Sequence, residues 1–120
     1  MRDHRETLRK LAIRDESLVH SIMAADRDGV SASGLDPKTE ALVRIAALVA
    51  VDAAPPSYMS VIESGFSAGA TVDEIVGTLL SVMPAIGVAD VVSEAPKLGL
   101  ALGYDVSVGL EELSGESSAR

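Results

Sequence analysis

The segment from Thr71 to Met83 constrains the fold more than any other part of the chain. Thr71 and Glu74 have the spacing of a helix capping box, in which each side chain accepts a hydrogen bond from the backbone N–H of the other residue. Apolar residues then recur at three- and four-residue intervals, at Val72, Ile75, Val76, Leu79, Leu80 and Met83. This pattern predicts an amphipathic helix.

Similar start and stop signals occur before this segment. Asp36 followed by Pro37 is typical of an N-cap and first helical position, and we expect that helix to run to about Val51. Pro55-Pro56 begins the next helix, and Gly69 is well placed to end it. Three helices are therefore expected between residues 36 and 83.

The remaining helices are predicted from shorter patterns. Apolar positions in residues 3–13 indicate a short amphipathic helix, and Asp15 can cap a second one. Pro84 should kink or end the central helix before Gly87, and a last helix follows up to about Gly103. Only residues 104–110 are strand-like. The sequence predicts an all-α bundle of about six helices.

Length and composition favour one domain. We expect it to cover residues 1–113 of the 120, followed by a flexible polar tail over 114–120. The predicted helix from Pro37 is apolar around nearly its whole circumference, which is typical of a helix buried on several sides. A chain this short would need other subunits for that burial, so we expect a homo-oligomer.

Charge and cysteine content exclude several functions. The net charge of −8 leaves no basic stripe for phosphate contacts, so we expect no nucleic-acid partner. The four basic residues among the first ten are interpreted as a solvated helix face in preference to a basic arm. The absence of cysteine excludes thiol chemistry and is compatible with the cytoplasm. The longest apolar run, Ile45–Val51, is too short to span a membrane.

The order of these signals resembles the carboxymuconolactone decarboxylase family, which includes the alkylhydroperoxidase D-like proteins. The resemblance covers roughly residues 34–103 and is carried by the segments GLDPKTEALVRIAALVAV and SGFSAGATVDEIVGTLLSVMPAIGVADVV. It implies an alkylhydroperoxidase D-like helical fold and homo-oligomers, commonly trimers or hexamers. It also implies a site at the start of the helix that precedes Gly69.

The family's peroxidase-like members carry a Cys-x-x-Cys pair and a histidine at that site. The matching positions here are Ala54, Ser57 and Val61, and the acidic position of the preceding helix falls on Ala41. Ser57 cannot replace a thiolate without an activating base, and Val61 cannot accept a proton. The histidine and acidic residues of the family's lactone decarboxylases are not matched either. The chain is therefore not expected to be a cysteine-dependent peroxidase.

Several residues remain as candidates for a site. Arg44 either pairs with Glu40 one turn away, which we favour, or holds a ligand carboxylate. Tyr58 is expected to be a half-buried packing residue with a hydrated hydroxyl, and Glu63 a surface residue; both are also weak catalytic candidates. The candidate binding residues are Arg44, Ser57, Tyr58, Met59 and Met83. The lone His20 has no partner at metal-ligand spacing, so we predict neither a metal nor a cofactor.

Three functional hypotheses follow. The first is a homo-oligomeric relative of this family without thiol chemistry, which binds a small apolar or carboxylated molecule or acts in assembly. The second is a cofactor-free lyase or isomerase that performs acid/base chemistry, such as decarboxylation or isomerisation, on a small lactone-like or carboxylated substrate. The third is a purely structural oligomer whose pocket is filled by side chains.

Overall fold

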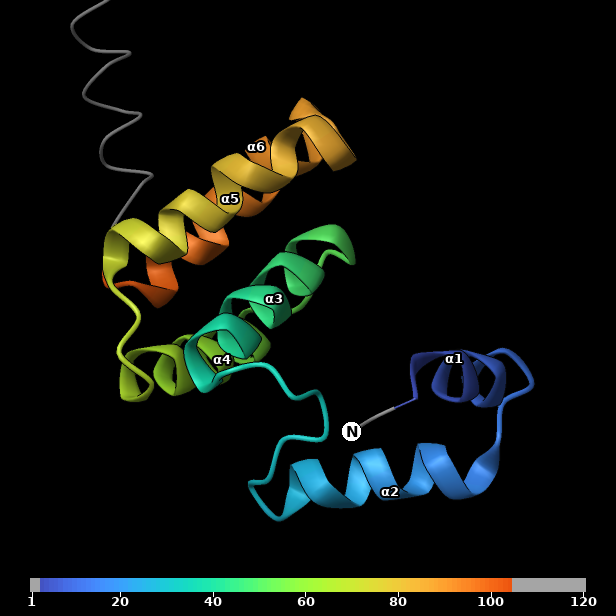
Figure 1. Ribbon diagram of the computed structural model, residues 1–120. Coiled ribbons are helices and arrows are strands. Elements are labelled where there is room, and N and C mark those ends of the chain that lie inside the picture. The colour runs from blue at the N-terminus through green and yellow to red at the C-terminus, as the bar shows by residue number, and fades with distance from the viewer. Residues whose placement is uncertain (1–2, 105–120) are drawn as a thin grey trace, which may run out of the picture. The chain divides into compact units, whose positions relative to one another are not determined.

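The computed structural model describes residues 3–104, and this part of the chain contains helices and no strand (Figure 1). The helices are α1 (His4–Ala12), α2 (Glu16–Arg27), α3 (Pro37–Ala50), α4 (Pro55–Ser67), α5 (Val72–Ile86) and α6 (Val88–Ala101). The predicted all-α class with about six helices is confirmed. The predicted tail and nearly all of the strand-like segment 104–110 lie outside the described residues.

Most predicted helix ends are confirmed by their hydrogen bonds. The Asp36 side chain accepts from the backbone N–H of Thr39 at 3.0 Å. Both halves of the capping box are formed, because Thr71 N–H donates to Glu74 at 2.9 Å and Glu74 N–H donates to Thr71 at 3.1 Å. Pro84 does not end α5, which continues to Ile86 and stops before Gly87.

The chain divides into two compact units at the boundary between Leu35 and Asp36. We call α1 and α2 the arm and α3 to α6 the bundle, and each is described by itself. The expectation of a single domain over residues 1–113 stays a prediction. Within the described residues no helix combines the length and the apolar character that crossing a membrane requires.

The bundle consists of two helical hairpins, α3–α4 and α5–α6, packed against each other (Figure 1). Helix α3 contacts α4, α5 and α6, and α4 also contacts α6. The buried apolar residues, all from the bundle and its connections, are Ala41, Ile45, Val49, Tyr58, Ile62, Ala70, Ile75, Leu79, Val91 and Leu98. The core therefore lies where the four helices meet.

The bundle leaves part of the predicted apolar surface uncovered. On α5, Ile75 and Leu79 are buried, whereas Val76 and Leu80 are exposed although they belong to the same predicted face. Helix α3 likewise buries the stripe Ala41, Ile45 and Val49 and exposes Val43. Four helices cover only the side of each helix that faces the shared core, so the wider apolar faces continue onto the surface.

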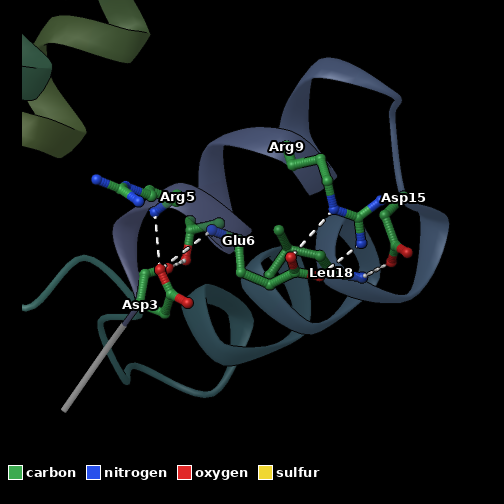
Figure 2. Close-up of polar contacts among 7 residues, drawn as sticks. Asp3, Arg5, Glu6, Arg9, Asp15 and Leu18 are labelled. Atoms are coloured by element: carbon green, nitrogen blue, oxygen red, sulfur yellow. Dashed lines mark hydrogen bonds and ion pairs between the residues drawn. The ribbon is translucent and has the colours of Figure 1, made fainter.

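The arm has no buried residue in either helix. Its polar contacts are local and hold the helix ends, as Figure 2 shows. Asp3 accepts from the backbone N–H of Arg5 at 3.0 Å, and Asp15 accepts from that of Leu18 at 2.9 Å. Glu6 and Arg9 form an ion pair one turn apart at 2.5 Å. These contacts order the arm's helix ends without giving it a core.

Candidate functional site

A polar network connects the two hairpins of the bundle. It consists of Asp52 in the α3–α4 connection, Tyr58 on the first turns of α4, and Glu94 and Lys97 on α6, and we call it the Glu94 network. Among the described residues Glu94 is the one buried charged residue, with only 2% of its surface exposed. An ionisable side chain buried this deeply requires compensating contacts.

Both carboxylate oxygens of Glu94 have a donor. The Tyr58 hydroxyl donates to Oε1 at 2.6 Å, and the Lys97 ammonium donates to Oε2 at 3.1 Å. Lys97 also forms a close ion pair with Asp52 and donates to the backbone carbonyl of Ala53 at 3.2 Å. Within the described residues, no buried side-chain nitrogen or oxygen lacks a hydrogen-bond partner.

Local structure places these groups together. Glu94 and Lys97 are three residues apart on α6, so their side chains lie on the same helix face. Asp52 follows the end of α3 with a φ of 54°, which turns the chain toward α4 and places its carboxylate beside Lys97. Tyr58 belongs to the face of α4 that also buries Ile62. The network therefore depends on three separate segments.

The electrostatic consequences are consistent with this arrangement. Burial, and then the hydrogen bond and charge of Glu94, raise the pKa of Tyr58 well above its ordinary value. The hydrogen bond with Asp52 raises the pKa of Lys97, and the same contact lowers the pKa of Asp52. Tyr58 therefore keeps its proton at neutral pH and acts as a hydrogen-bond donor instead of an acid.

A cavity of about 130 Å³ lies next to the network. Its lining residues are Val49, Ala50, Asp52, Asp90, Ser93 and Glu94. Three of these carry carboxylates, so the cavity favours neutral or positively charged groups over anions. No group of three or more histidine, cysteine, aspartate or glutamate side chains in the described part of the chain is arranged to hold a metal ion.

A second, open depression of about 640 Å³ lies between the start of α3 and α4. It is lined by Pro37, Ser60, Glu63, Ser64, Ser67 and Ala68. Glu63, the second catalytic candidate from the sequence, is exposed on its wall. Glu63 and Tyr58 therefore belong to different places on α4, one at the surface and the other in the core.

The predicted binding residues belong to three helices, α3, α4 and α5. Arg44 pairs with Glu40 at 2.5 Å, which is the favoured interpretation of its sequence position. Ser57 and Met59 are exposed at the start of α4, and Met83 packs against the core from α5. None of these four lines either cavity described above. Their role in ligand binding stays a prediction.

Tyr58 differs from its sequence-based interpretation. Its side chain is fully buried, and its hydroxyl is bonded to Glu94 instead of to water. Sequence reasoning missed Glu94 and Lys97 altogether. The available signal was a pair of opposite charges three residues apart in the segment Val88–Leu102, which is mainly apolar apart from this pair, Asp90 and Ser93. Such a pair on an apolar helix indicates a polar contact inside the fold.

The positions matched to the family's reactive residues lie at the start of α4. Ala54 is the N-cap of this helix and provides no side-chain cap, Ser57 is exposed one turn later, and Val61 packs partly buried against the core. Comparison with known proteins found no matching family model, no matching curated protein and no matching solved structure.

Proposed function

We propose that this chain is a carboxymuconolactone decarboxylase-like protein without thiol peroxidase chemistry. It forms a homo-oligomer, and its function is to take part in an assembly of protein subunits. The observation that carries the proposal is the uncovered apolar surface of the α5–α6 hairpin. Leu80, Val88, Val92 and Leu100 are each 62–64% exposed. We call these four residues the hairpin surface.

An apolar surface of this kind favours association with another protein surface. Large contiguous apolar patches are rare on monomeric proteins and mark interaction sites. Val88 and Val92 are one turn apart on α6, so they lie on the same side of that helix. A second copy offers the same apolar surface, and most soluble oligomers are copies of one chain arranged around a closed symmetry axis. A trimer or hexamer is the assembly that the family resemblance favours.

Assembly is better supported than binding of a small molecule. Ligand pockets commonly enclose about 300–1,000 Å³. The cavity beside Glu94 encloses only about 130 Å³, and the depression of about 640 Å³ on α4 is open at the surface instead of enclosing a ligand. The carboxylates of the smaller cavity also disfavour the carboxylated ligand predicted from the sequence. The hydrogen bonds of the Glu94 network support a structural role, because they join α6 to α4 and to the α3–α4 connection.

The experiment is the solution mass by light scattering at micromolar concentration. We expect three or six times the chain mass of 12.4 kDa. The double variant Leu80→Asp/Val92→Asp should shift the mass toward that of smaller species while helicity is retained, because both side chains are already exposed. Ser81→Asp, an exposed substitution on α5, is the matched control. A wild-type monomer would overturn the proposal.

A second candidate function rests on Glu94 itself. This carboxylate is almost completely buried and lines a cavity, a setting in which proteins place general bases. The chemistry would be cofactor-free proton transfer on a small uncharged lactone. Glu94→Gln should then abolish the turnover of small lactones, while Asp73→Asn, at an exposed position on α5, should leave it intact. Absence of turnover by the wild-type protein would exclude this candidate.

A further inference from the structure

The arm exposes an apolar face that nothing in its own unit covers. Leu8, Leu11, Ile13 and Met23 are 47–65% exposed, and neither arm helix contains a buried residue. The side chains of α1 and α2 therefore form an amphipathic pair with no core. This surface is distinct from the hairpin surface, because all four residues belong to the arm.

Short helices with no buried residues do not persist alone in water. Helix α1 has 9 residues and α2 has 12, whereas isolated helices shorter than about 12–15 residues are marginal even in favourable sequences. The end groups already have their caps, as the contacts of Asp3 and Asp15 in Figure 2 show. The stabilisation that is still missing must come from covering the apolar side chains.

The charges of the arm indicate what covers them. Residues 3–14 carry four basic and two acidic side chains, a net charge of +2. Residues 15–28 carry one basic and four acidic side chains, a net charge of −3. When two arms are related by a two-fold axis, α1 of each can face α2 of the other, so that opposite charges meet twice. Complementary charges of this kind fix the register of a protein interface.

We infer that the arms of two copies of this chain pair, with α1 of one copy packed against α2 of the other. Leu8, Leu11 and Ile13 of one arm then meet the Met23 side of the other, and the four helices bury together the apolar faces that each arm exposes. A two-fold arrangement is self-complementary and closes at two copies. The inference does not rest on the hairpin surface, which would form a separate contact.

Cross-linking tests this arrangement directly. The chain contains no cysteine, so single-cysteine variants of the full chain carry one thiol each. A mixture of Leu8→Cys protein with Met23→Cys protein, one of them enlarged by a tag, is oxidised at micromolar concentration. We expect a disulfide-linked heterodimer within minutes. Mixtures in which Ser17→Cys replaces Met23→Cys should link at least ten times more slowly, because residue 17 lies about 120° around α2 from Met23.

Paired substitutions separate this contact from the hairpin surface. In this experiment the link is formed between Leu11→Cys and Met23→Cys proteins, so that position 8 is free for substitution. Leu8→Asp, added to both proteins, should abolish the link between α1 and α2, and Ser17→Asp, added in the same way, should preserve it. Leu80→Asp/Val92→Asp should also preserve it, whatever its effect on mass. Equal linking rates for Met23→Cys and Ser17→Cys would overturn the arm pairing and leave the proposed function standing. A fast and specific cross-link between two arms that persists in the Leu80→Asp/Val92→Asp background would support the arm pairing and would not bear on the hairpin surface.

Discussion

The hydroxyl of Tyr58 donates a 2.6 Å hydrogen bond to the carboxylate of Glu94, and both residues are buried although 36 positions separate them in the chain. This contact joins the first turns of α4 to the middle of α6. It places the polar group of the largest fully buried side chain against the one buried charge of the described residues. The stability of the bundle should therefore depend on this pair.

Tyr58→Phe should destabilise the protein by about 1–3 kcal/mol, because it leaves one oxygen of a buried carboxylate without its donor. Urea unfolding followed by circular dichroism measures this change. Tyr104→Phe is the control, because Tyr104 is 56% exposed and should change the free energy of unfolding by less than about 0.5 kcal/mol. Equal effects of the two substitutions would contradict the importance of the buried contact.

Glu94→Leu should cost more than Tyr58→Phe. It removes the acceptor of both Tyr58 and Lys97, and loss of one member of a buried ion pair typically costs about 3–5 kcal/mol. The reference is Glu63→Leu, which makes the same chemical change at an exposed position on α4. Thermal unfolding of the two variants compares them. A smaller loss in Glu94→Leu than in Glu63→Leu would show that the network does not stabilise the fold.

The pH dependence of stability follows from the shifted pKa values. Folding raises the pKa of Tyr58 and of Lys97, so their contributions are complete below their ordinary values of 10.0 and 10.5 and are lost as the pH rises above them. Folding lowers the pKa of Asp52, so its contribution is present above 3.8 and is lost as the pH falls below that value. Unfolding midpoints in urea should fall on both sides of a neutral plateau. Tyr58→Phe should reduce the loss of stability at high pH. If that loss is unchanged in the variant, the raised pKa of Tyr58 does not contribute to it.

Gly87 and Gly77 should respond oppositely to alanine. Gly87 joins α5 to α6 with φ 101° and ψ 158°, a conformation that only glycine adopts readily. Its replacement should destabilise the protein by about 1–3 kcal/mol. Gly77 lies inside α5, and an added Cβ there meets no atom within 4 Å. Gly77→Ala should stabilise the protein by about 0.5–1 kcal/mol. The melting temperatures of the two variants test this difference. Shifts in the same direction would disprove the distinct roles given to the two glycines.

The helix ends were predictable because their signals are local. The Asp36 cap, the Thr71–Glu74 capping box and the Gly69 stop each depend on contacts within a few residues, so the sequence alone contains all the partners. Pro84 was harder to interpret. Helix α5 continues two residues past it to Ile86, and Gly87 with its positive φ ends the helix.

The candidate site was less predictable because its partners are distant in the chain. The hydroxyl of the buried Tyr58 finds its acceptor in Glu94, 36 residues later, and no local pattern indicates that pairing. The apolar periodicity of α5 showed that Val76 and Leu80 belong to an apolar face, but not which part of the face the bundle covers. Periodicity gives the orientation of a face and contains no information about the number of neighbours.

Lys97 holds the α3–α4 connection through Asp52 and the carbonyl of Ala53, 45 and 44 positions before it. A chain synthesised from its N-terminus therefore exposes α3, α4 and the left-handed Asp52 before the side chains that secure them exist. Until α6 leaves the ribosome, the hydroxyl of Tyr58 lacks its acceptor Glu94, and the turn at Asp52 lacks its donor Lys97. We expect the bundle to close late in synthesis, with its last helix completing the first hairpin.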